Sequence, residues 1–135
     1  MGQNCIGIER LIVHQSLYDE LHGLLSERVR KMRPGSVLAQ SPEGYVATVE
    51  GGAMISGDRF EALERIIEAA NEDGANIEGG KVYKHSYLNN GYYFQPTIVG
   101  PVYQTMDIAK EERACLSRAF LKCSNVIQYS RLSPY

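Results

Sequence analysis

The chain has 135 residues, of which 44% are apolar, so it has the length and apolar content for one folded domain with a core, and an intrinsically disordered protein is excluded. Its 16 acidic and 14 basic residues leave a net charge of -2, so we expect no nucleic-acid partner. The sequence has no apolar run that would span a bilayer and no signal-peptide pattern, so we expect no membrane segment and a cytoplasmic location.

The first predicted elements are a strand and a helix. The apolar run at 11–14 predicts a buried strand, and Ser16 is the expected N-cap of a helix, with Asp19 in the capping-box position. Pro34-Gly35 is expected to end this helix. An apolar stripe at helical spacing is formed by Leu17, Leu21, Leu24, Leu25 and Val29. The basic residues near its end are interpreted as compensating the helix dipole: Arg28, Arg30, Lys31 and Arg33.

A loop with a brief strand at 45–49 is expected next, and then a second helix from about Ser56 to Asn71, with Gly74 as its C-cap. Its buried face is predicted to contain Phe60, Leu63, Ile66, Ile67 and Ala70. Short extended segments are predicted at 75–78, 92–94, 97–99 and 120–123, with a helix or turn at 106–112. This order of elements predicts an α/β layer structure with crossover helices.

The cysteines and histidines do not form a metal or disulfide pattern. Cys5, Cys115 and Cys123 are an odd number and form no CxxC pair, and the three histidines are scattered. We therefore expect reduced thiols and no metal site.

Cys5, in the run Gly2-Gln3-Asn4-Cys5, is the residue at which covalent chemistry would begin. A cysteine at the start of a short helix lies near the positive end of the peptide dipoles, which favours the nucleophilic thiolate. The alternative interpretation is a buried, small apolar residue, because free cysteine is among the most buried residue types.

In their order and spacing, these segments resemble the C-terminal half of the catalytic domain of the NAD(P)-dependent aldehyde dehydrogenases. The resemblance is carried by Gly2-Gln3-Asn4-Cys5, similar to the family's GQxC nucleophile motif, by Arg10, by Gly52-Ala53-Met54-Ile55, by Gly74-Ala75 and Gly79-Gly80, by Gly91-Tyr92-Tyr93-Phe94-Gln95-Pro96-Thr97, and by Ile108-Ala109-Lys110-Glu111-Glu112. It implies part of an open, mostly parallel sheet with crossover helices over residues 1–112, followed by a divergent tail at 113–135.

The resemblance also implies a reaction. Cys5 would attack the carbonyl of a small-molecule aldehyde, hydride would pass from the thiohemiacetal to NAD or NADP, and the resulting thioester would be hydrolysed. Glu112 matches the glutamate that holds the nicotinamide ribose, since a carboxylate accepts two hydroxyl hydrogen bonds well. A homo-oligomer is implied for the complete enzyme.

Three departures from the family pattern limit what the isolated chain is expected to do. The dinucleotide-binding domain, the side-chain amide of the oxyanion hole and the general-base glutamate would all precede the nucleophile, which indicates that an upstream part is missing. After Glu112 the sequence reads Arg113-Ala114-Cys115, where the family has an aromatic residue, glycine and proline. We therefore expect little or no dehydrogenase activity from this chain alone, because losing a general base costs about 10²–10⁴-fold in rate.

Two other functions remain open on the sequence. The first is a non-catalytic interaction or oligomerisation module derived from such an enzyme. The second is a thiol acyltransferase or hydrolase, which would need His14 or His85 near Cys5.

Overall fold

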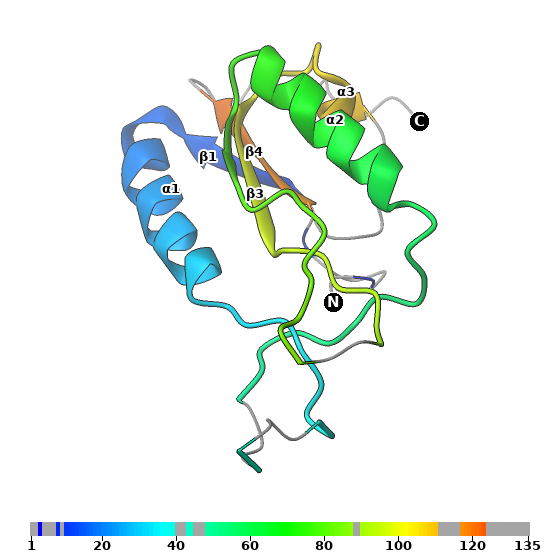
Figure 1. The fold of residues 1–135 in the computed structure, drawn as a ribbon. Coiled ribbons are helices and arrows are strands. Elements are labelled where there is room, and N and C mark those ends of the chain that lie inside the picture. The colour runs from blue at the N-terminus through cyan, green and yellow to red at the C-terminus, as the bar shows by residue number, and fades with distance from the viewer. Residues whose placement is uncertain are drawn as a thin grey trace.

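The computed structural model describes residues 10–39, 48–87 and 90–110, the backbone of 117–123, and Gln3, Ile8, Glu43 and Gly44 outside these ranges. Cys5, Glu112 and the segment at 45–47 that was predicted to begin a strand lie outside the described residues. The described part forms a four-stranded sheet between two helical layers, with one long helix on one face and a long and a short helix on the other (Figure 1).

The strands are β1 (Arg10–His14), β2 (Asn76–Glu78), β3 (Thr97–Val102) and β4 (Ser117–Cys123). Their order across the sheet is β1-β4-β3-β2. The β1–β4 and β3–β4 pairs are parallel, and the β2–β3 pair is antiparallel. The prediction of an α/β fold with a mostly parallel sheet is therefore confirmed.

The strand last in the sequence, β4, lies in the middle of the sheet. It pairs with β1 on one side, from Arg10 opposite Ala119 to His14 opposite Cys123, and with β3 on the other. Parallel neighbours need a crossover connection, and the segment between β3 and β4 contains α3 (Asp107–Lys110). The tail that was predicted to diverge thus contributes a strand that pairs with both β1 and β3.

The first helix, α1 (Gln15–Arg30), begins earlier than its sequence predicts. His14 is the N-cap, and its Nδ1 accepts a hydrogen bond from the backbone N–H of Ser16 at 3.3 Å. The prediction that Ser16 caps the helix is therefore wrong. The physical reason is that α1 follows β1 without a loop, so the last strand residue takes the capping position.

The buried face of α1 is also rotated from the predicted stripe. Tyr18 and Ser26 are buried, whereas Leu17 and Leu24 are 58% and 60% exposed. The other stripe residues, Leu21, Leu25 and Val29, pack against a cluster of Val13, Tyr18 and Ile98. Because successive helical residues are about 100° apart, a face centred one position later leaves Leu17 and Leu24 outside.

The second helix, α2 (Phe60–Glu72), packs its predicted face on the core, with Leu63, Ile67 and Ala70 buried and Phe60 and Ile66 partly buried. It begins four residues later than expected, after a turn in which the Phe60 N–H donates to the Gly57 carbonyl at 3.0 Å. The C-cap is Asp73, one residue before the predicted Gly74. Gly74 follows it with φ of +94°, and its N–H donates to the Asn71 carbonyl, so the glycine ends the helix from the next position.

The main core lies between the sheet and α2 with α3, while the smaller cluster lies under α1. Adjacent residues of β3 belong to different clusters: Val99 is in the main core, and Ile98 is in the cluster under α1. This alternation is the two-residue period of a strand, and it explains why β3 is apolar on both faces. The main core comprises Met54, Leu63, Ile67, Ala70, Ala75, Phe94, Val99, Val102, Met106 and Ile108.

Candidate functional site

Hydrogen bonds link three places that are far apart in the sequence: Gln3, the pair at 54–55, and Tyr92. The side chain of Gln3 accepts, through Oε1, a hydrogen bond from the N–H of Ile55 at 2.9 Å. The neighbouring Met54 donates its N–H to the carbonyl of Tyr92 at 2.7 Å. Gln3, two residues before Cys5 in the sequence, is therefore tied to the Gly52–Ile55 segment, and that segment to the one beginning at Gly91.

The segment beginning at Gly91 is itself held by the core. Phe94 is fully buried, and its ring lies 5.3 Å from that of Phe60 on α2. Gly91 has φ of +116°, and a Cβ there would lie 2.5 Å from the ring of Tyr93. Glycine is therefore required at this turn both for its backbone conformation and for the close approach of the buried tyrosine.

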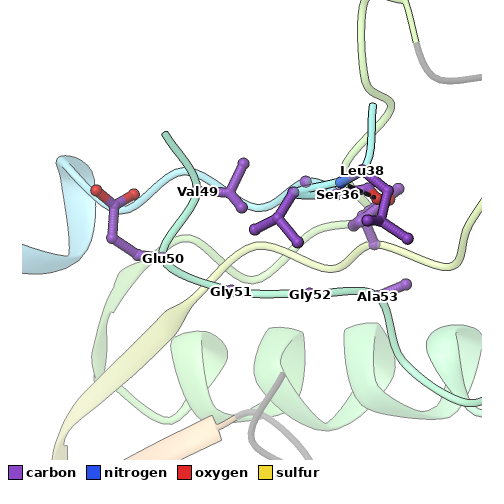
Figure 2. A pocket seen from close by; sticks show the side chains of 10 residues that line it. Ser36, Leu38, Val49, Glu50, Gly51, Gly52 and Ala53 are labelled. Atoms are coloured by element: carbon purple, nitrogen blue, oxygen red, sulfur yellow. Dashed lines mark hydrogen bonds between the residues drawn. The ribbon is translucent and has the colours of Figure 1, made fainter. Parts of the chain in front are cut away.

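A hollow of about 360 Å³ lies beside these segments, between the chain at 35–38 and the chain at 49–53, with the buried Tyr93 also in its wall (Figure 2). Three of its lining residues are glycines, and within it the N–H of Leu38 donates to Ser36 Oγ at 3.3 Å. Its acidic residue, Glu50, lies at the end away from Ser36 and Leu38 (Figure 2). Glu50 is already paired with Arg33, so it does not give the hollow a free acid or base. The hollow could recognise a ligand by its shape and by its backbone polar groups.

Arg33 and Glu50 close the base of the loop that forms the hollow. The Arg33 N–H and Nε donate to Glu50 Oε2 at 2.8 and 3.2 Å, and Nη2 donates to Oε1 at 2.6 Å. Two backbone hydrogen bonds lie alongside, from Glu50 N to the Arg33 carbonyl and from Gly35 N to the Gly51 carbonyl. The arginine side chain and then its backbone N–H lower the pKa of Glu50 from 4.5 to about 2.

This pair predicts a pH-dependent opening of the loop. A carboxyl group whose folded-state pKa is depressed stabilises the closed loop fully above its ordinary pKa, and this stabilisation is lost as the pH falls from about 4.5 to about 2. We expect protection of the Glu50 and Gly35 amides from hydrogen exchange, corrected for intrinsic rates, to fall through this window. In Glu50→Gln the protection should not vary with this titration, and the same pH dependence in that variant would contradict the assignment.

The two candidate histidines, His14 and His85, each contact nearby residues of the fold. His14 Nδ1 lies 2.8 Å from Ser16 Oγ in the cap of α1. The ring of His85 packs edge-on against Tyr87, with centroids 4.2 Å apart, and also contacts Tyr83 and Tyr93. These contacts do not connect either ring with Gln3 or Ile55, so they do not support a cysteine–histidine pair.

Sequence reasoning identified Gln3 only as part of a motif and did not predict its contact with Ile55. It also did not predict the pairing of Arg33 with Glu50, because the basic residues near the end of α1 were interpreted through the helix dipole. Among the described residues, no group of three or more histidines, cysteines or acids is arranged to hold a metal ion. In the same part of the chain, no helix has the length and hydropathy needed to cross a membrane.

The profile of the aldehyde dehydrogenase family matches residues 1–114. The chain belongs to this family. A putative aldehyde dehydrogenase-like protein of Saccharomyces cerevisiae is 36% identical over 140 aligned positions, covering 99% of the chain and 21% of that protein. Aldehyde dehydrogenase 1A1 of Oryctolagus cuniculus is 37% identical over 111 residues, covering 82% of the chain and 20% of the enzyme.

Solved structures agree with this membership. Betaine aldehyde dehydrogenase from Staphylococcus aureus, in complex with NAD+, superposes with a TM-score of 0.76 at 28% identity, covering 92% of the chain and 24% of that enzyme. This aldehyde dehydrogenase chain therefore spans about a fifth of the length of the curated relatives named above. The alignment with the S. cerevisiae protein includes the tail that supplies β4.

Proposed function

We propose that this chain is the nucleophile-bearing part of an NAD(P)-dependent aldehyde dehydrogenase, and that Cys5 is its nucleophile. The observation that carries the proposal is the link from Gln3, two residues before Cys5 in the sequence, to Ile55, and from the neighbouring Met54 to Tyr92. In this proposal residues 1–112 are part of the catalytic domain and residues 113–135 are a divergent tail. The location is proposed to be the cytoplasm.

The substrate is a small aldehyde, whose oxidation to a carboxylic acid begins at the thiolate of Cys5. The thiolate attacks the carbonyl carbon, and the C=O π electrons move to the oxygen, where the N–H of Cys5 is proposed to be one hydrogen-bond donor. Hydrolysis of the final thioester returns the carboxylic acid and the free thiol. The general base that activates water, and a second oxyanion donor, are assigned to parts of the protein outside this chain, so the chain alone is proposed to be inactive.

Glu112 is the residue proposed to hold the nicotinamide ribose. It follows α3 in the sequence, and Ile108 of that helix is buried in the main core. A carboxylate suits two ribose hydroxyls, because it can accept both of their hydrogen bonds. When bound, NAD or NADP supplies the hydride acceptor that converts the thiohemiacetal to the thioester.

The proposal can be tested by trapping the acyl group on the thiol. The protein that contains this chain is mixed with an aldehyde and NAD+ or NADP+, quenched in acid within the first turnover, and digested for peptide mass spectrometry. We expect the Cys5 peptide to carry the mass of the acyl group, with the Cys115 and Cys123 peptides unmodified. Production of NADH or NADPH with no acyl group on Cys5 would contradict the proposal.

The second candidate function is a non-catalytic module that pairs with another copy or with a complete relative. It is favoured by apolar side chains left exposed on the described surface, among them Leu38 at 91% and Ile55 at 86%. Co-purification with a complete aldehyde dehydrogenase, in the absence of any acyl group on Cys5, would favour this function. A homo-oligomer is proposed in either case.

A further inference from the structure

We propose that Gln3 is a positioning residue for Cys5, acting through the hydrogen bond that its side chain makes with the backbone of Ile55. The inference rests on the proposed function, because it takes Cys5 as the nucleophile. Gln3 Oε1 lies 2.9 Å from Ile55 N, and the contact joins residues 52 positions apart. Only Asn4 separates Gln3 from Cys5 in the sequence, so a restraint on Gln3 acts within two peptide units of the thiol.

The partner of Gln3 is a segment that the core holds in place. Met54 is only 5% exposed and packs in the main core with Leu63 and Phe94. Its N–H donates to the Tyr92 carbonyl, while the next N–H along the chain, that of Ile55, points to Gln3. Gln3 is therefore docked on backbone that is fixed from the other side, which is what a positioning contact needs.

The contact depends on the amide oxygen and not on apolar packing. The side chain of Ile55 is largely exposed, and Gln3 is exposed as well, so burial of apolar surface does not explain why they meet. A hydrogen bond in water adds little to global stability, because both groups can bond to solvent when it breaks. Loss of the Gln3 acceptor is thus expected to change the reactivity of Cys5 much more than the folding of the protein.

The test compares three variants of Gln3 in the protein that contains this chain. Gln3→Met keeps the approximate length but has no oxygen acceptor, Gln3→Asn keeps the amide but is one methylene shorter, and Gln3→Glu keeps an acceptor at the same reach. The matched control is Gln104→Met, at an exposed glutamine in the turn after β3. The readouts are kcat and KM for aldehyde oxidation, the midpoint of thermal unfolding, and the rate of Cys5 alkylation by iodoacetamide, localised by peptide mass spectrometry.

We expect Gln3→Met and Gln3→Asn to lower kcat by about 10-fold to 100-fold, with KM for the cofactor and thermal unfolding nearly unchanged. Alkylation of Cys5 should slow toward the rate of a free thiol, and Gln3→Glu should recover most of both rates. Unchanged alkylation and kcat in Gln3→Met and Gln3→Asn would overturn the inference. So would equal losses in all three variants, because Gln3→Glu retains the acceptor.

Failure of the proposed function gives a different pattern. If Cys5 carries no acyl group during turnover, the nucleophile assignment is wrong whatever the Gln3 variants do. If Cys5 is acylated but the Gln3 variants react like the parent protein, only the positioning role is wrong.

Discussion

On the proposed function, replacing Cys5 by serine is expected to abolish aldehyde oxidation in the protein that contains this chain, with a fall in kcat of at least about 10⁴-fold. A serine hydroxyl ionises far less readily than a thiol, and no adjacent base has been assigned to take its proton. The measurement is NADH or NADPH formation over a panel of aldehydes, at enzyme concentrations high enough to detect the residual rate.

The matched controls are Cys115→Ser and Cys123→Ser, which make the same exchange of sulfur for oxygen at the other two cysteines. Both are expected to retain most of the activity, provided that the protein remains folded. Equal activity in Cys5→Ser and in the parent protein would show that Cys5 is not the nucleophile. Loss of activity in Cys115→Ser alone would indicate that Cys115, in the tail, is the nucleophile instead of Cys5.

Gly79→Ala is expected to destabilise the fold by at least about 3 kcal/mol, which is large for the addition of one methyl group. Gly79 has φ of +84°, a conformation that costs an L-residue about 1 kcal/mol or more. A Cβ at this position would also lie 2.2 Å from the carbonyl oxygen of Pro96. Since that atom is backbone just before β3, the chain between β2 and β3 has to move, and the measurement is the free energy of unfolding in denaturant.

Gly74→Ala separates the two causes of this destabilisation. Gly74 also has positive φ, +94°, but an added Cβ there would meet no atom within 4 Å. It is expected to cost only the conformational penalty of about 1 kcal/mol. Equal destabilisation in the two variants would mean that the approach of Pro96 to Gly79 does not matter in the folded protein.

The elements that the sequence predicted well are those defined by a local pattern. The apolar face of α2, from Phe60 to Ala70, was predicted from its spacing; in the structure Leu63, Ile67 and Ala70 are buried, and Phe60 and Ile66 are partly buried against the same core. The strand predicted at 120–123 is present as part of β4. Such predictions succeed because burial of one face imposes a period that is visible in a short stretch of chain.

The candidate site was predictable in part. The family could be recognised from motifs that are each contiguous, and membership is confirmed. The assignments of Cys5 and Glu112 stay predictions, because both lie outside the described residues. No sequence pattern predicts the contact of Gln3 with Ile55, because the two residues are 52 positions apart. In addition, the donor is a backbone N–H, which every residue except proline has, so the identity of Ile55 does not indicate it.

The sequence alone determined the types and approximate places of most helices and strands, the apolar face of α2, and membership of the family. The tertiary structure alone decided where α1 begins and which way it faces, because His14 at the end of β1 takes the cap and Tyr18 rather than Leu17 meets the sheet. It also decided that β4 lies between β1 and β3. Local periodicity fixes what an element is, whereas its neighbours and its rotation depend on which distant surfaces it can bury, and no short segment of the chain carries that information.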